Sequence, residues 1–131
     1  MLYYNPSLIA NKKVLVDCDK SSDFHQKEYP DGLTIDQQGI LWAALYNGSG
    51  VVKVNPITGK VEDRVFIPSP LTTSVSFGGP NFDHLFVTTA YKNFGPDLRK
   101  TWKDAGKVFQ ITADVKSFKG SAGNRYLPVK M

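Results

Sequence analysis

The chain has 131 residues, the length of one ordinary domain, and its 41% hydrophobic and 21% charged residues are typical of a globular protein. No apolar run approaches the roughly 20 residues that a membrane-spanning helix requires, so we expect no membrane partner. The net charge of +4 is uneven, because residues 1–90 carry 7 Lys/Arg and 9 Asp/Glu whereas residues 91–131 carry 9 and 3. The basic residues of the second part are scattered and follow no aromatic or recognition-helix pattern, which argues against a nucleic-acid partner.

Two features bear on the compartment of the protein. Cys18 is the only cysteine, which excludes an internal disulfide and fits a reducing compartment. The first residues, MLYYNPSLIANKK, lack the basic start and apolar stretch of a secretory signal. These features predict a cytoplasmic protein.

Short segments rich in β-branched and aromatic residues follow one another along the chain, separated by turns that contain Gly, Pro or Asn. They predict strands at residues 13–17, 32–36, 40–46, 51–55, 61–67, 74–79, 84–90 and 107–112. Before the last strand, DLRKTWKDA (97–105) allows a turn or two of helix, but it fits a loop better. The sequence therefore predicts an all-β fold.

The predicted strands form an internal repeat with an offset of about 42 to 44 residues. GLTID (32–36) is echoed by SVSFGG (74–79), and LWAALY (41–46) by LFVTTA (85–90). In the second unit an insertion at 91–105 displaces the third strand. A four-stranded unit of about 40 to 45 residues has the size of one β-propeller blade.

The repeat predicts a single partial β-propeller domain that covers residues 1–131. Its parts are an atypical start (1–10), the outer strand of a preceding blade with a linker (11–28), one blade (29–70) and a closing blade (71–131) with the insertion at 91–105.

Pro30-Asp31-Gly32 comes just before the first inner strand, where a propeller loop opens at one mouth of the central channel. The simplest interpretation is a turn, because Pro fixes φ, Asp bonds its own backbone and Gly takes the left-handed position. The alternative is functional, because carboxylates that converge on a channel mouth can hold a metal or a polar ligand. These residues alone leave both interpretations open.

Other polar residues have structural explanations. Asp36 and Asp83 lie in turns between strands, where an Asp side chain accepts backbone amides. Trp42 belongs to an inner strand, and we expect it in the core. His25 and His84 have no ligand-spaced partners, and we expect both at the surface.

Two short motifs contain residue types that occur both in turns and at functional sites. Asn47-Gly48-Ser49 is formally a glycosylation sequon, but a tight turn fits it better. Thr72-Thr73 just precedes an inner strand, so one of the two hydroxyls can approach the channel.

Three motifs carry a resemblance to a known family. PDGLTIDQQGILWAALYNGSGVVKVNPITGKV (30–61) resembles the regucalcin (senescence marker protein), gluconolactonase and luciferin-regenerating enzyme family in its PDG-x-x-x-D-x-x-G-x-L-W-x-A pattern and the P-x-T-G-x-V that follows. LTTSVSFGGPNFDHLFVTTA (71–90) resembles the family's T-S-x-x-F-G-G segment, and AGKVFQIT (105–112) resembles its closing strand. The resemblance covers roughly residues 11–131.

This resemblance implies a six-bladed propeller with a divalent metal, namely calcium, zinc, manganese or magnesium, in its central channel. The implied activity is hydrolysis of a small-molecule sugar lactone, as in gluconolactonase, and Asp31 is implied to be a metal ligand that helps to activate the attacking water. The chemistry is sound, because a metal polarises the lactone carbonyl and lowers the pKa of bound water, and a nearby carboxylate can take the proton.

The chain also departs from the family. The other metal ligands of the family, a Glu near the start and an Asn one blade before PDG, have no counterpart here, and six blades need about 260 residues. We therefore expect missing propeller blades or self-association to cover the open faces of the chain. Two alternatives to a lactonase stay open: a calcium-binding regulatory protein without hydrolysis, and an inactive truncated fragment.

Overall fold

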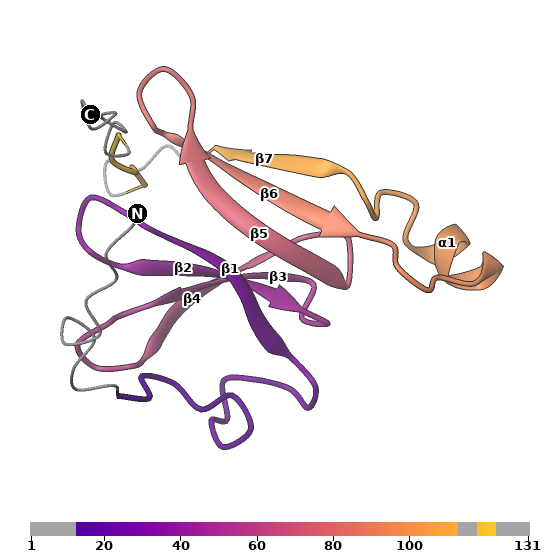
Figure 1. The fold of residues 1–131 in the computed structure, drawn as a ribbon, viewed down its shortest axis with the longest axis horizontal. Helices are drawn as coiled ribbons and strands as arrows, with labels where there is room; N and C mark the ends of the chain where they lie inside the picture. The colour runs from indigo at the N-terminus through magenta and orange to yellow at the C-terminus, as the bar shows by residue number, and fades with distance from the viewer. Residues whose placement is uncertain (1–12, 113–117, 123–131) are drawn as a thin grey trace, which may run out of the picture.

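The computed structural model of the protein describes residues 13–112 and 118–122. In these ranges the elements are β1 (Tyr29–Ile35), β2 (Leu41–Tyr46), β3 (Gly50–Val54), β4 (Val61–Phe66), β5 (Leu71–Gly78), β6 (His84–Ala90), α1 (Pro96–Thr101) and β7 (Val108–Thr112) (Figure 1). The fold is almost entirely β, as the sequence predicts. No helix in the described ranges is long and apolar enough to cross a membrane.

The strands form two antiparallel meanders. β1 to β4 pair in chain order, and β5, β6 and β7 do the same. The meanders join where Tyr46 of β2 pairs with Leu71 of β5, and the sheet curls there so that the two meanders face each other (Figure 1). Each meander corresponds to one repeat unit, so β1 and β5 are the first, innermost strands of two successive blades.

The main core lies between the two meanders. Because side chains alternate along β2, Trp42 and Ala44 point into this core while Leu45 points to the opposite face. The rings of Trp42, Phe77 and Phe118 pack edge to face, with centroids 5.3 to 5.9 Å apart. Trp42 is 4% exposed, which confirms the prediction that it is a core residue.

The strands β1–β3 also have a face that points away from the main core. We call it the first face, and it is only partly covered. Leu45, Val52 and Val54 are buried there under Leu15, Val16 and Phe24 from the segment that precedes β1. Residues 13–17 form no strand, so the prediction of a strand there was wrong. The segment lies against side chains of a sheet face, where no free backbone groups are available to pair with it.

The interpretation of residues 97–105 as a loop was also wrong, because α1 covers Pro96–Thr101. Pro96 begins the helix, Asp97 lies in its first turn, and Arg99 and Lys100 lie in its last turn, as the helix dipole favours. No residue of α1 is buried, so the helix has none of the apolar periodicity by which a helix is recognised in a sequence.

Asp36 confirms its predicted role as a turn residue. One carboxylate oxygen accepts the backbone N–H groups of Gln38 (2.9 Å) and Ile40 (3.0 Å). The other accepts the indole N–H of Trp42 at 3.0 Å, and the carboxylate is 3% exposed. Asp83 differs from the prediction, because its carboxylate lies 3.1 Å from His84 Nδ1 rather than on backbone amides.

We expect Asp36→Ala to lower the free energy of unfolding by about 3 kcal/mol, because three donors lose a charged acceptor and one of them, the Trp42 indole, is buried. Urea unfolding followed by near-UV circular dichroism measures this loss. Asp83→Ala is the matched control, since that carboxylate is 43% exposed and should cost less than about 1 kcal/mol. Equal losses in the two variants would contradict the assigned role of Asp36.

Candidate functional site

Asp31 lies inside β1, at an irregularity of the strand. Pro30 pairs with Leu45 and Leu33 pairs with Ala43, so β1 advances by three residues where β2 advances by two. The extra residue makes a β-bulge, a feature that bends a strand and redirects a side chain, often beside a functional site. The turn interpretation of this motif was therefore wrong, and the Asp31 side chain is exposed.

The neighbours of Asp31 explain why the motif can lie in a strand. In the described ranges β1 pairs only with β2, and an edge strand tolerates a residue such as Pro30 that has no N–H to donate. A Cβ at Gly32 would lie only 2.7 Å from the Cα of Ser74 in β5. Glycine thus lets the innermost strands of the two blades approach each other directly beside Asp31.

The register shows which other segments lie at the same end of the strands as Asp31. Tyr29 pairs with Tyr46, Tyr46 with Leu71, and Leu71 with Ala90. The starts of β1 and β5 and the ends of β2 and β6 therefore meet at one end, which we call the Asp31 end. The connections at 47–49, 67–70 and 91–107 all lie there, on the right-hand side of Figure 1.

The described residues do not form a complete metal site. No group of three or more His, Cys, Asp or Glu side chains in residues 13–112 and 118–122 is placed to hold an ion. Asp31 can supply one carboxylate, whereas a structural zinc takes about four ligands and calcium six to eight oxygens. In this part of the chain, the residues therefore do not fit a bound metal by themselves.

Of the other residues considered from the sequence, Thr72 and Thr73 lie near the start of β5, at the Asp31 end, whereas His84 does not. Thr72 lies within β5, fully buried, and its hydroxyl donates to the carbonyl of Ser69 at 3.4 Å. The Thr73 hydroxyl lies 2.8 Å from that of Thr88. His84 begins β6 and is therefore at the end of the strands opposite to Asp31.

Two further expectations are confirmed. His25 is exposed, as predicted. Asn47 and Ser49 have φ values of +63° and +48°, which is the backbone of the tight turn predicted for Asn47-Gly48-Ser49. The Asn47 side chain donates to the carbonyl of Lys27 at 3.2 Å and so links this turn to the segment that enters β1.

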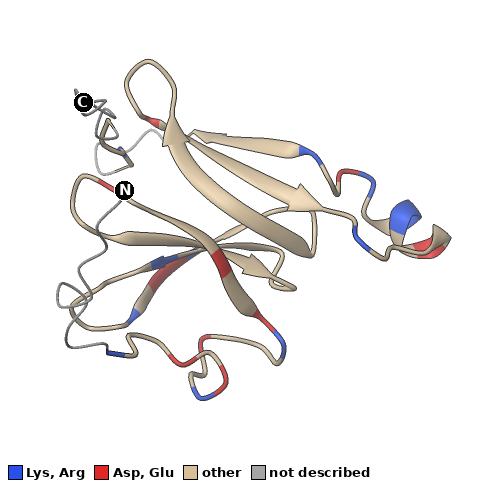
Figure 2. Ribbon diagram, viewed as in Figure 1, with Lys and Arg blue, Asp and Glu red and all other residues tan. Residues whose placement is uncertain are grey.

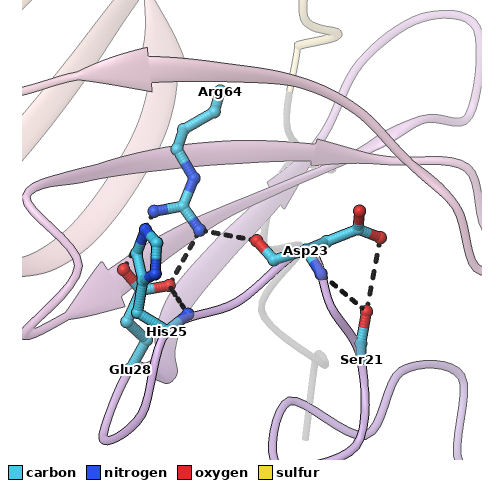
Figure 3. A network of polar contacts seen from close by, with 5 residues as sticks. All are labelled: Ser21, Asp23, His25, Glu28 and Arg64. Carbon is cyan, nitrogen blue, oxygen red and sulfur yellow. Dashed lines mark hydrogen bonds and ion pairs between the residues drawn. The ribbon is translucent and has the colours of Figure 1, made fainter.

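The sequence did not reveal a partly buried ion pair close to Asp31 in the chain. Glu28 is 4% exposed and accepts two hydrogen bonds from Arg64 of β4, at 2.9 and 2.8 Å. The same carboxylate accepts the backbone N–H of His25 at 3.1 Å, and Arg64 also donates to the carbonyl of Asp23 at 3.0 Å (Figure 3). The pair thus ties the segment just before β1 to the outer strand of the same blade.

No sequence signal marks this pair, because its members are 36 residues apart and belong to no shared motif. Its effect on the site is positional, since Glu28 immediately precedes β1 and lies three residues before Asp31. The hydrogen bonds from Arg64 lower the pKa of Glu28, against the raising effect of burial. In the same way, Glu28 raises the pKa of Arg64.

We expect Glu28→Gln to lower the free energy of unfolding by about 2 kcal/mol at neutral pH, because Arg64 loses a buried charged partner. The folded-state pKa of Glu28 lies below its ordinary value of about 4.3, so its contribution is complete above about pH 5 and is lost as the pH falls through the folded value. Denaturant unfolding at several pH values from about 3 to 7 should show the two proteins converging in acid. A constant difference over this range would contradict the pair's contribution.

Comparison with known protein sequences identifies relatives along most of the chain. Residues 3–91 match the family described as SMP-30/Gluconolactonase/LRE-like region. The chain is 36% identical to human regucalcin over 104 residues, which cover 79% of this chain and 33% of regucalcin. It is 41% identical over 111 residues to an uncharacterized protein of Sulfolobus acidocaldarius, with 82% of this chain and 34% of that protein covered. The chain thus spans about a third of the length of these relatives.

Comparison with solved structures finds proteins of the same kind. The fold matches a luciferin-regenerating enzyme with a TM-score of 0.72 and 35% identity, over 92% of this chain and 38% of the enzyme. It matches a regucalcin of Agrobacterium tumefaciens, described as a calcium-binding protein, with a TM-score of 0.65 and 26% identity, over 75% and 33% of the two chains. The chain therefore belongs to the SMP-30/gluconolactonase/LRE-like family, and its two meanders are part of a β-propeller.

Proposed function

We propose that this chain supplies part of a divalent-metal-dependent sugar-lactone hydrolase of the gluconolactonase type. The observation that carries the proposal is the placement of Asp31, whose exposed carboxylate lies on a bulge of the innermost strand β1, within the motif PDG. Family membership and the similarity to a regucalcin described as calcium-binding support the use of a divalent metal. The cytoplasm is the proposed location, where Cys18 stays reduced.

In this proposal Asp31 is one ligand of a site that blades outside this chain complete. An accessible carboxylate suits both roles proposed for it, because carboxylate oxygens bind divalent cations and can accept a proton from water. The ion pair of Glu28 and Arg64 acts as a positioning device, since it fixes the segment from which β1 begins.

A second candidate function is calcium binding without hydrolysis. The description of the Agrobacterium tumefaciens relative as a calcium-binding protein favours it. This candidate uses the same carboxylate and requires the same missing ligands, so only turnover distinguishes it from the lactonase.

The test uses the longest natural protein that contains these residues. After chelation, hydrolysis of gluconolactone is measured with and without added calcium, zinc, manganese or magnesium, and metal binding is measured by calorimetry. We expect turnover that depends on added metal. Metal binding without turnover would replace the lactonase by the binding function, and absence of both would overturn the proposal.

A further inference from the structure

The connection between β6 and β7, residues 91–107, is a structured element that we call the β6–β7 arm. The Thr89 hydroxyl fixes its base, because it accepts the backbone N–H of Gly106 at 2.9 Å and donates to the carbonyl of Lys107 at 2.8 Å. Gly106 has a φ of +87°, and a Cβ there would overlap the ring of Tyr91. The arm, with α1 in it, projects from the rest of the fold (Figure 1).

The arm carries an open pocket of ≈ 220 Å³. Its lining consists of two aromatic residues, two cationic residues and an alanine, namely Tyr91, Trp102, Arg99, Lys103 and Ala105. The Arg99 guanidinium lies over the Tyr91 ring, 5.1 Å from its centroid, and its Nε donates to the carbonyl of Phe94 at 3.1 Å. These two contacts hold the guanidinium in place beside the pocket, and its terminal nitrogens have no hydrogen-bond partner among residues 13–112 and 118–122.

The charge of the arm favours an anion. Residues 91–107 contain five Lys/Arg and two Asp, and one of the two, Asp104, is paired with Lys107. Basic positions recur along the arm, as the blue segments of Figure 2 show. A held guanidinium and an ammonium that line the same pocket are the donors that bind a carboxylate or a phosphate group.

We propose that this pocket binds the carboxylate or phosphate group of a small anionic ligand. The arm starts directly after β6, at the end of the strands where Asp31 lies. The rings of Tyr91 and Trp102 offer apolar walls to the rest of the ligand, and ≈ 220 Å³ is enough for its anionic end. This inference is independent of the proposed lactone hydrolysis.

Binding is tested first on the 131-residue chain, with Trp102 as the fluorescent reporter. The chain is titrated with inorganic phosphate, gluconate, gluconate 6-phosphate and uncharged glucose. We expect saturable changes with the anions and none with glucose, and the stronger of the gluconate and phosphate responses identifies the preferred anion. Trp102→Phe should remove the signal, because Trp42 is buried in the core.

Arg99→Gln should weaken anion binding at least about tenfold, because the bidentate donor is lost. Lys100→Gln is the matched control: it is the adjacent basic residue of α1 and does not line the pocket, so it should leave binding within about twofold. Equal effects of the two substitutions would show general charge attraction and would overturn the site. Absence of any saturable anion response would overturn it as well.

Discussion

Replacing Asp31 by Asn is expected to reduce metal-dependent lactone hydrolysis by about a hundred- to a thousandfold in the longest natural protein that contains these residues. Asn keeps the size of the side chain and removes the negative charge that the proposed metal ligation and proton transfer require. The fold should be unaffected, because Asp31 is exposed and the bulge depends on the backbone and on Gly32.

The measurement is kcat/KM for gluconolactone as a function of metal concentration, together with far-UV circular dichroism and calorimetric metal binding. Asp83→Asn is the control, because Asp83 lies just before β6, at the opposite end of the strands, and should leave activity unchanged. Wild-type activity with normal metal dependence in Asp31→Asn would remove Asp31 from the site. Loss of activity with intact metal binding would restrict its role to proton transfer.

The 131-residue chain alone is expected to self-associate. Leu33 and Ile35 of β1 are 59% and 52% exposed, and Leu33 borders the apolar first face over Leu45 and Val52. A propeller covers such faces with neighbouring blades and closes its ring, whereas two blades leave an apolar face and a strand edge open.

The same incompleteness leaves Asp31 without further ligands from this part of the chain. We therefore expect the 131-residue chain to bind divalent metal no tighter than about millimolar and to hydrolyse no lactone.

Size-exclusion chromatography with light scattering, over a range of protein concentrations, measures the association. The double substitution Leu33→Lys and Ile35→Lys should shift the chain strongly towards monomer, because it places charge on the exposed face of β1. Ile57→Lys is the matched control, since Ile57 is 88% exposed in the turn between β3 and β4 and should leave association unchanged. A wild-type chain that is monomeric at every concentration would show that the open face needs no partner. Tight metal binding by the same chain would show that the metal site needs no ligands from other blades.

Local sequence patterns were sufficient for most of the strands. The strands predicted at ILWAALY (40–46) and HLFVTTA (84–90) agree with β2 and β6 within one residue, because turn residues bound them and apolar side chains fill them. The repeat and the PDG motif likewise pointed to a propeller and to Asp31. The sequence-based prediction fails where the structure depends on contacts with other segments. Residues 13–17 have a strand-like composition, but they form no strand. No residue of α1 is buried, so the helix lacks the apolar periodicity by which it could be predicted.

By itself, the sequence determined most of the strands, the family and the identity of the candidate carboxylate, because each depends on neighbouring residues or on a contiguous motif. The tertiary structure decided the bulge at Asp31, the Glu28–Arg64 pair and the position of the β6–β7 arm at the Asp31 end. These features depend on strand register and on contacts between segments that are far apart in the chain. The alternation of side chains within one segment does not predict either of them.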